Sequence, residues 1–391
     1  MINSLLGPQV LLLLLCCFVG KVVSRTLTYE SLNITRYPLA KCNDGSDAGI
    51  YFANSNASKP TSFIIYLSSG GWCYDAVSCR ARFLESHDLM SSTGWSSERE
   101  VGGIFDSDYE TLNEDSVWVN VPYCSSDGWM GNLDNQEVGF EFRGHEIVKA
   151  AIETVQERWS VGEDDTVIFG GASAGARGAM VHLDMVAEFF NDSNVYGVLD
   201  SPLWIDLDPP NYSTVGLLEQ TQKVYEVSGV GEVSGKDGVI TDNCASSFDG
   251  EEEYKCLFGQ YRAGFLEIPH ILISAEFDSF QLGQDGLNLP YPSSENEFAD
   301  EFGAQMHKVF EDLIANVGDK SVTFYSQPCY NHAISMGSGY FKSATSNGVT
   351  LDAAVKAFLG GEGKSRDLTD YCEEGFDACT TSGSFCPSLG A

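Results

Sequence analysis

Positively charged residues are scarce in this chain of 391 residues. It holds 22 lysines and arginines against 56 aspartates and glutamates, which gives a formal net charge of −34 at pH 7. A nucleic-acid-binding protein needs a basic surface that releases counterions from phosphate, so the composition excludes a general binder of that class. The same charge disfavours adsorption to anionic membranes or sulfated glycans.

Long apolar runs are also absent beyond the N-terminus. Residues 10–20 read VLLLLLCCFVG, a run shorter than the roughly 20 residues of a membrane span but of the length of a signal-peptide core. Small or modest residues follow at Val22 and Ser24. We therefore expect residues 1–24 to be a signal peptide cleaved after Ser24, and residues 25–391 to be secreted without stable membrane insertion. An uncleaved N-terminal anchor is the alternative.

No cysteine pair has zinc-ribbon spacing, so the sequence predicts no metal cluster. Of the 12 cysteines, two lie in the expected signal peptide, and an even number in an exported chain predicts disulfides. Four sequons, at Asn33, Asn56, Asn191 and Asn211, predict glycosylation. The disulfide candidates are Cys42, Cys73, Cys79, Cys124, Cys244, Cys256, Cys329, Cys372, Cys379 and Cys386.

Strand-like and helix-like segments alternate along the chain, without an internal repeat or a Pro-rich linker. This order predicts an α/β fold, a mostly parallel central sheet with helices on both faces, in a single domain over residues 25–391. Residues 209–261 are expected to form an insertion over the sheet's edge, stapled by Cys244–Cys256, and residues 361–391 a disulfide-pinned coil. Strands are predicted over 62–67, 116–121, 165–169, 195–199, 271–275 and 321–326, and helices over 145–159, 174–190, 295–317 and 351–359.

The clearest motif is Gly171-Ala-Ser-Ala-Gly175, which joins a predicted strand to a predicted helix. This is the G-x-S-x-G pattern in the strand–turn–helix context of the nucleophile elbow of α/β-hydrolases. Glycines at both ends allow neighbouring backbone to pass close. Ser173 is therefore the predicted nucleophile, and an inert serine in a Gly-rich turn is the alternative.

A serine nucleophile needs a base, and in α/β-hydrolases the acid and then the histidine follow the serine. Three histidines qualify. His270 begins a strand, at the wrong end of a sheet whose sites lie at strand carboxyl ends. His307 lies inside a helix beside an apolar stripe. His332 follows a strand in a loop, so elimination predicts His332 as the base, against the alternative of a structural histidine.

The acid that orients the base is expected at the end of an intervening strand. Asp278 lies there, and it would accept the Nδ1–H of His332. Glu276 is the competitor, because strand alternation places both carboxylates on the same side. Asp278 is preferred because it lies past the strand end, although a simple turn or cap residue would also be found there.

A Gly-rich turn at residues 68–74 follows an early strand, where these hydrolases offer backbone N–H groups to an oxyanion. Gly71 and Trp72 are the predicted donors, with Ala174 as a third. A tight turn with a core tryptophan is the alternative. A Cys73–Cys79 disulfide would lock this loop, and Trp72, Tyr74 and Trp129 are candidates to line the substrate pocket.

Together these motifs resemble the Notum and pectin acetylesterase family of secreted carboxylesterases. The resemblance implies an α/β-hydrolase fold, the triad Ser173, Asp278 and His332, and an oxyanion hole from Gly71, Trp72 and Ala174. The matching segments are 41–51, 70–73, 122–129, 142–144, 171–175 and 199–201, with Asp278 and residues 329–332.

The two branches of this family differ in the acyl group they remove: palmitoleoyl from a protein serine for Notum, acetyl from a polysaccharide for pectin acetylesterases. Residues 42–46, 89–92 and 123–129 look more like Notum. Residues 71–74 look more like the pectin branch, because Cys73 stands where Notum has an aromatic residue. Ala176 and Arg177 replace the usual glycine after the elbow.

The sequence thus predicts an enzyme without metal or cofactor that deacylates an acylated extracellular protein, Notum-like and palmitoleoyl-type. A polysaccharide O-deacetylase is the first alternative. A catalytically silent ectodomain that binds an acylated ligand, and a protease or thioesterase with the same triad, are the others. No nucleic-acid partner is expected, and the oligomeric state is left open.

Overall fold

A ten-stranded sheet forms the centre of the molecule, in the order β14-β11-β10-β9-β8-β3-β5-β2-β1-β4. The computed structural model describes residues 25–109, 111–210, 214–232, 239–240, 242–287, 293–343, 345–361 and 366–381. The expected signal peptide, the Asn211 sequon and Cys386 lie outside these ranges. Asn33, Asn56 and Asn191 are exposed, as glycosylation requires.

All six predicted strands are present, and they lie next to one another as the parallel centre of the sheet. Their side chains are almost entirely buried, because helices or loops cover both faces. They are β3 (Ser62–Leu67), β5 (Val117–Val121), β8 (Thr166–Ala172), β9 (Asn194–Asp200), β10 (His270–Asp278) and β11 (Val322–Asn331).

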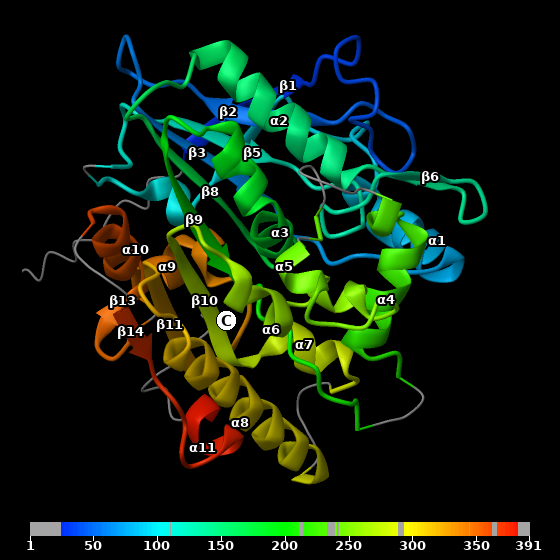
Figure 1. The fold of residues 1–391 in the computed structure, drawn as a ribbon, viewed down its shortest axis with the longest axis vertical. Helices are drawn as coiled ribbons and strands as arrows, with labels where there is room; N and C mark the ends of the chain where they lie inside the picture. The colour runs from blue at the N-terminus through cyan, green and yellow to red at the C-terminus, as the bar shows by residue number, and fades with distance from the viewer. Residues whose placement is uncertain are drawn as a thin grey trace, which may run out of the picture.

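Residues alternate between two apolar cores along these strands. Phe63 and Ile65 of β3 belong to the core that packs against α2 (Gly144–Trp159), α3 (Ala174–Phe189) and α8 (Ser293–Ala315). Ile64 and Tyr66 point to the opposite core, which packs against α10 (Leu351–Leu359). Figure 1 shows α8 running alongside β10, with α10 at the other side of the sheet. The predicted α/β fold with helices on both faces is confirmed.

Three antiparallel strands extend the sheet beyond β5, and they were not predicted from the sequence. They are β1 (Arg25–Ser31), β2 (Gly49–Ala53) and β4 (Glu98–Val101). β4 forms the edge of the sheet and β1 lies beside it, and both carry many exposed polar residues, so they lack the continuous apolar run of a buried strand. Two short hairpins lie outside the sheet, β6 (Leu133–Asn135) with β7 (Phe140–Phe142) and β12 (Thr345–Ser346) with β13 (Val349–Thr350).

The insertion of residues 209–261 was expected over the sheet's edge. Its described part packs on Trp72 and Trp204, which follow the carboxyl ends of β3 and β9, and on Val181 of α3. In Figure 1 its helices gather on the side of the molecule where α1 lies, opposite α10. They are α4 (Leu217–Val227), α5 (Asp242–Ala245) and α6 (Gly259–Arg262), next to α7 (Ser279–Gln284) and near α1 (Ala76–Glu85). The expected Cys244–Cys256 disulfide is present.

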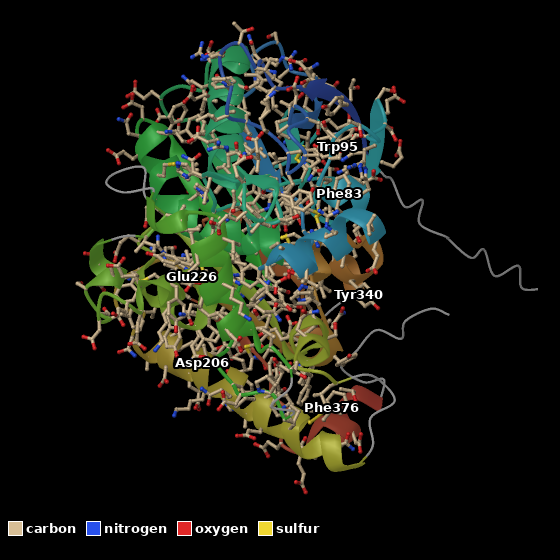
Figure 2. The ribbon with its side chains drawn as sticks, turned by 90° about the vertical axis from the view of Figure 1, so that its right-hand side faces the viewer. Phe83, Trp95, Asp206, Glu226, Tyr340 and Phe376 are labelled. Carbon is tan, nitrogen blue, oxygen red and sulfur yellow. A yellow bond between two sulfur atoms is a disulfide. The ribbon has the colours of Figure 1, made fainter. Side chains whose placement is uncertain are left out.

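The C-terminal segment is more ordered than the coil expected for it. β14 (Arg366–Thr369) pairs in parallel with β11 and forms an edge of the sheet. A Cys372–Cys379 disulfide then holds α11 (Phe376–Thr381), and Figure 2 labels Phe376 at the start of this helix. The ring centre of Phe376 lies 5.1 Å from that of Phe277. The four residues of β14 are too short a run for periodicity to mark as a strand.

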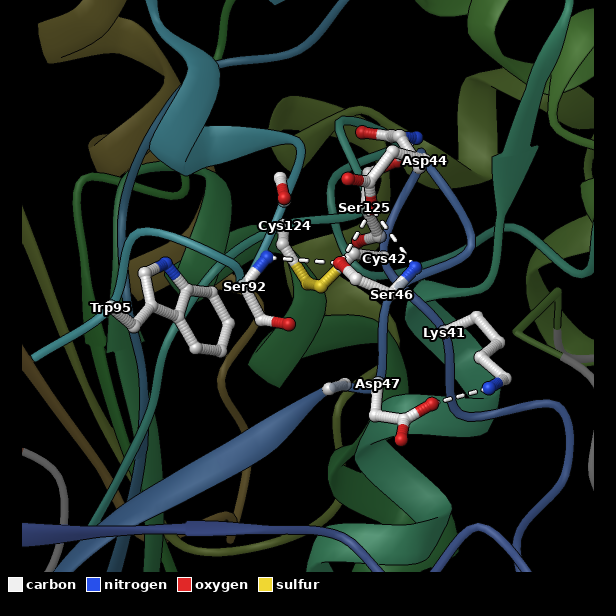
Figure 3. Close-up of a disulfide and its surroundings, with 12 residues drawn as sticks. Lys41, Cys42, Asp44, Ser46, Asp47, Ser92, Trp95, Cys124 and Ser125 are labelled. Carbon is white, nitrogen blue, oxygen red and sulfur yellow. Dashed lines mark hydrogen bonds and ion pairs between the residues drawn. A yellow bond between two sulfur atoms is a disulfide. The ribbon is translucent and has the colours of Figure 1, made fainter. Parts of the chain in front are cut away.

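Two further disulfides fix loops near the candidate site. Cys73–Cys79 closes the Gly-rich turn onto α1, as expected. Cys42–Cys124 joins chain segments 82 residues apart. Figure 3 shows its surroundings, where the Ser46 hydroxyl lies between Asp44 and the N–H of Ser92. Cys329 is disulfide-bonded as well.

No helix in the described ranges has both the length and the apolar character needed to cross a membrane. The remaining short helices are α9 (Ser338–Ser343) and several 3-10 turns.

A buried glutamate in β10 makes a testable contribution to stability. Burial raises the pKa of Glu276 from 4.5 to about 8, while its carboxylate accepts the N–H of Cys372 at 3.0 Å. Between these two pKa values the unfolded chain binds fewer protons than the folded one, so stability falls as pH rises through this window. Glu276→Gln removes the ionisation but keeps an acceptor oxygen.

We expect Glu276→Gln to match the wild-type stability near pH 4 and to exceed it by about 2–5 kcal/mol above pH 8. Urea unfolding of both proteins across this pH range measures the difference. Stability curves that stay parallel at every pH would contradict the assignment.

Candidate active site

Ser173 occupies a strained turn between β8 and α3. Its backbone has φ 55° and ψ −119°, outside the regions that non-glycine residues favour. Its N–H donates to the carbonyl of Asp200 at 2.8 Å, since Ala172 and Asp200 are register partners in β8 and β9. This places the serine at the carboxyl edge of the sheet and at the N-terminus of α3.

The flanking glycines are required by close backbone contacts. A Cβ on Gly171 would lie 2.3 Å from the carbonyl carbon of Gly175, and a Cβ on Gly175 would lie 2.1 Å from the carbonyl oxygen of Leu67. Both distances are far below van der Waals contact. The elbow therefore packs directly on the end of β3, from which the predicted oxyanion loop begins.

His332 and Asp278 form a hydrogen bond, with 2.7 Å between Nδ1 and a carboxylate oxygen. Asp278 is fully buried, and its other oxygen caps α7 by accepting the N–H groups of Phe280 and Gln281, each at 3.0 Å. A bulge in β11 sets this geometry. Ala275 pairs with Gln327 but Phe277 pairs with Tyr330, because β11 has one residue more in between.

Pro328 lies in this bulge, where its missing N–H costs no ladder hydrogen bond. After the bulge Asn331 pairs with Asp278, so His332 follows directly beside the carboxylate. Burial by itself would lower the pKa of His332, but the charge and hydrogen bond of Asp278 outweigh it, and the pKa is raised above 6.5. Nε2 of His332 is buried and has no partner among the described residues.

Asp200 connects the loop of His332 to the strand that supports Ser173. Its carboxylate accepts the N–H of Ser335 at 2.7 Å and the hydroxyl of the same residue at 2.6 Å. The hydroxyl of Ser201 accepts the N–H of Ala333 at 3.0 Å. The segments on both sides of the site are thus bound to the same pair of residues at the end of β9. From the sequence, Leu199-Asp-Ser201 was recognisable only as part of a motif, which predicted no role for Asp200.

The structure does not bring the competing residues to this place. The carboxylate of Glu276 binds Cys372 in the C-terminal segment. His270 starts β10, is buried, and its Nδ1 bonds the carbonyl of Ile268 at 2.8 Å. His307 lies within α8, with Nε2 3.4 Å from Glu311.

The predicted oxyanion loop leaves β3 at Leu67 and turns sharply. Gly71 has φ 63°, a left-handed conformation that favours glycine. Cys73 donates its N–H to Ser126 at 3.0 Å, whereas the N–H groups of Gly71 and Trp72 have no acceptor among the described residues. The N–H of Ala174 belongs to the first turn of α3, which has no acceptor within the helix.

Two residues that the sequence analysis did not single out hold this loop in place. Arg82 of α1 donates to the carbonyl of Gly70 and, at 2.8 Å, to the hydroxyl of Ser126. Asp127 is fully buried and pairs across from Trp72 in an isolated bridge. Its position within the matched segment 122–129 was the available signal.

The carboxylate of Asp127 collects four hydrogen bonds. It accepts the hydroxyl of Ser125 at 2.6 Å and the N–H groups of Trp129, Gly131 and Gly144 at 2.8, 3.1 and 2.8 Å. Burial nevertheless raises its pKa to about 6. A single buried carboxylate thus fixes the loop of residues 125–131, which packs against the predicted oxyanion loop.

Trp129 does not line a pocket, which corrects the expectation for this residue. It has no exposed surface, its Nε1 donates to the carbonyl of Ser68 at 3.1 Å, and its ring packs on Tyr123. Through this hydrogen bond Trp129 holds the start of the predicted oxyanion loop in place. Tyr74 is half-buried and packs against the apolar cluster around Trp72, and the ammonium of Lys223 lies 5.6 Å from its ring centre.

Trp72 is nearly buried and held from several sides. Its Nε1 donates to Gln220 of α4 at 3.0 Å, and its ring lies edge-on to Trp204 with 4.7 Å between ring centres. Trp204 in turn packs on Phe280, which stacks on the ring of His332 at 5.1 Å. An aromatic series therefore links the oxyanion loop to the histidine.

Among the described residues, one group of three side chains of metal-binding type lies close together, and this group is away from the candidate active site, in the C-terminal segment. Cys372, Glu374 and Cys379 lie close to one another, but the two cysteines form a disulfide and are not thiolate ligands. The carboxylates of Asp200 and Asp278 at the site are occupied by the N–H and O–H donors named above.

Known proteins resemble this chain over most of its length. The family model of pectinacetylesterase matches residues 26–379. Palmitoleoyl-protein carboxylesterase notum2 of Xenopus laevis is 26% identical over 343 residues, covering 83% of this chain and 66% of that protein. The human palmitoleoyl-protein carboxylesterase NOTUM is 27% identical over 307 residues, covering 75% of this chain and 59% of that protein.

The chain spans between 43% and 66% of the length of three of the curated relatives that it matches. A solved structure of the Wnt deacylase Notum from Drosophila superimposes with a TM-score of 0.77 at 23% identity, covering 89% of this chain and 97% of that one. At this identity the likeness shows a common fold. Because the family match extends over nearly all of the described residues, the chain belongs to the pectinacetylesterase family.

Proposed function

We propose that this chain is a secreted serine carboxylesterase that removes an O-linked acyl group from an extracellular substrate. Ser173 is the nucleophile, His332 the base and Asp278 the acid that orients the base. The hydrogen bond of 2.7 Å between His332 and a fully buried Asp278, at the sheet edge where the strained Ser173 lies, carries the proposal.

The reaction follows from these positions. The hydrogen bond from Nδ1–H to Asp278 leaves Nε2 of His332 as the acceptor for the Ser173 proton. The serine oxygen then attacks the ester carbonyl, and the resulting oxyanion is stabilised by the N–H groups of Gly71, Trp72 and Ala174. His332 returns the proton to the leaving alcohol, and water cleaves the acyl-enzyme by the same route. This proposal uses no cofactor.

The relatives' names point to an acylated protein as substrate. Several are called palmitoleoyl-protein carboxylesterases, so the first candidate is a Notum-like protein O-deacylase of palmitoleoyl type. An O-deacetylase acting on a polysaccharide is the second candidate. It is favoured by Arg177 and Trp204, whose fully buried side chains fill the space beside Trp72.

Export is part of the proposal. The disulfides Cys42–Cys124, Cys73–Cys79, Cys244–Cys256 and Cys372–Cys379 are typical of proteins from an oxidising compartment. The predicted signal peptide and the exposed sequons at Asn33, Asn56 and Asn191 are consistent with passage through a secretory route.

Replacing the nucleophile tests the enzymatic role. We expect Ser173→Ala to abolish hydrolysis of p-nitrophenyl acetate and butyrate and to prevent labelling by a fluorophosphonate probe, while the circular dichroism spectrum stays native. Ser246→Ala, at an exposed serine far from the site in sequence, is the control and keeps both signals. A wild-type protein that binds acylated ligands without any labelling would instead be a silent binding protein.

The pH dependence tests the pairing of base and acid. Hydrolysis needs neutral His332, whose pKa is raised above 6.5, so kcat/KM should fall as pH drops, with a midpoint above 6.5. Asp278→Asn removes the charge that raises this pKa. We expect it to move the midpoint down and to lower kcat by a factor on the order of 10⁴.

Glu276→Gln makes the same carboxylate-to-amide change two residues earlier and serves as the matched control. It should leave the midpoint and the rate close to those of the wild type. The opposite result, with Glu276→Gln inactive and Asp278→Asn active, would assign the acid to Glu276.

A further inference from the structure

A fully buried cation lies one helical turn from the candidate nucleophile. Arg177 of α3 has no exposed surface, and its N–H donates to the carbonyl of Ser173 at 3.0 Å. Helical side chains lean toward the N-terminus of their helix, so the side chain of Arg177 extends back toward the elbow. Its guanidinium carbon lies 4.4 Å from the ring centre of Trp72 and 4.1 Å from that of Trp204.

The guanidinium has few polar partners for a buried charge. Nη2 donates to the carbonyl of Leu257, whereas Nε and Nη1 have no partner in the described part of the chain. Burial lowers its pKa to about 9, which leaves the group charged at neutral pH. The two indole faces offset only part of the desolvation cost. Arg262 is equally buried but lies 3.6 Å from the carboxylate of Asp184.

Arg177 lies between the aromatic residues that connect the predicted oxyanion loop to His332. Trp72 belongs to the predicted oxyanion loop, and Trp204 connects through Phe280 to His332. Around them lies an apolar cluster that includes Met130, Val181, Leu217, Val224 and Phe258. An acyl group on Ser173, with its carbonyl oxygen toward Gly71 and Trp72, would extend toward this cluster, where the buried side chains of Arg177 and Trp204 pack beside Trp72.

We propose that Arg177 determines the acyl-chain length that this site accepts, and that its side chain, held between Trp72 and Trp204, limits the substrate to short acyl groups such as acetyl. The inference rests on the proposed esterase activity. Of the two acyl classes considered above, it favours the short one.

An acyl-length series on the whole mature chain tests this role. The wild-type protein, Arg177→Ala and Arg177→Met are each assayed with p-nitrophenyl acetate, butyrate and octanoate. We expect the wild type to prefer acetate, and Arg177→Ala to raise the octanoate-to-acetate ratio of kcat/KM by at least about tenfold, as an added methylene contact in an apolar pocket does. Arg177→Met removes the hydrogen bond to Leu257 and the guanidinium contacts with the two indoles, and it leaves a flexible apolar side chain that can move aside for an acyl chain. Its ratio should therefore rise as well, even if the alanine variant folds poorly.

Arg262→Ala removes another buried guanidinium without touching Trp72, and its ratio should equal that of the wild type. Thermal unfolding of each variant confirms that it is folded. The inference is overturned if the wild type hydrolyses octanoate as well as acetate, or if folded Arg177 variants keep the wild-type ratio. Absence of both ester hydrolysis and fluorophosphonate labelling in the wild type would overturn the esterase proposal itself, and the inference with it.

Discussion

The contact between the backbone of Gly175 and the carbonyl oxygen of Leu67 is the constraint on which the candidate site depends. It brings the start of α3 against the end of β3 with no room for a side chain. The elbow and the Gly-rich loop that follows β3 are thereby placed next to each other before any polar contact is made. Strain at Ser173 persists because the surrounding sheet and helix fix both of its neighbours.

Buried carboxylates then lock the loops around that contact. Asp127 holds the segment under Trp72, Asp200 holds the loop after His332, and Asp278 holds the imidazole and caps α7. Each accepts several N–H or O–H groups, which offsets the cost of burying a charge. In a chain with a net charge of −34, these acids stand apart from the solvated acidic surface by their burial.

The central strands, the main helices and the motif residues were predictable because their signals are local. A strand buried on both faces reads as an apolar run, and the elbow needs two glycines at fixed spacing. The antiparallel strands β1 and β4 were missed because their many exposed polar residues give a weak pattern, and β2 because it has only five residues. Trp129 was assigned to a pocket because nothing in the local sequence distinguishes an aromatic ring that lines a pocket from one that is fully buried behind the pocket lining. The partners of Arg177 come from segments 27 and 80 residues further along, at Trp204 and Leu257, and only the folded chain brings them together.

The Cys42–Cys124 disulfide has a consequence for biosynthesis. During synthesis Cys42 leaves the ribosome before Cys73 and Cys79, two thiols that meet it earlier than its native partner does, because that partner lies 82 residues downstream. Native pairing therefore requires that Cys73 and Cys79 pair with each other first, that β2 and β5 associate before oxidation, or that a mispaired bond is exchanged afterwards. Recombinant production should depend strongly on a host compartment with disulfide isomerase, and oxidation that is too rapid should yield scrambled, inactive chains.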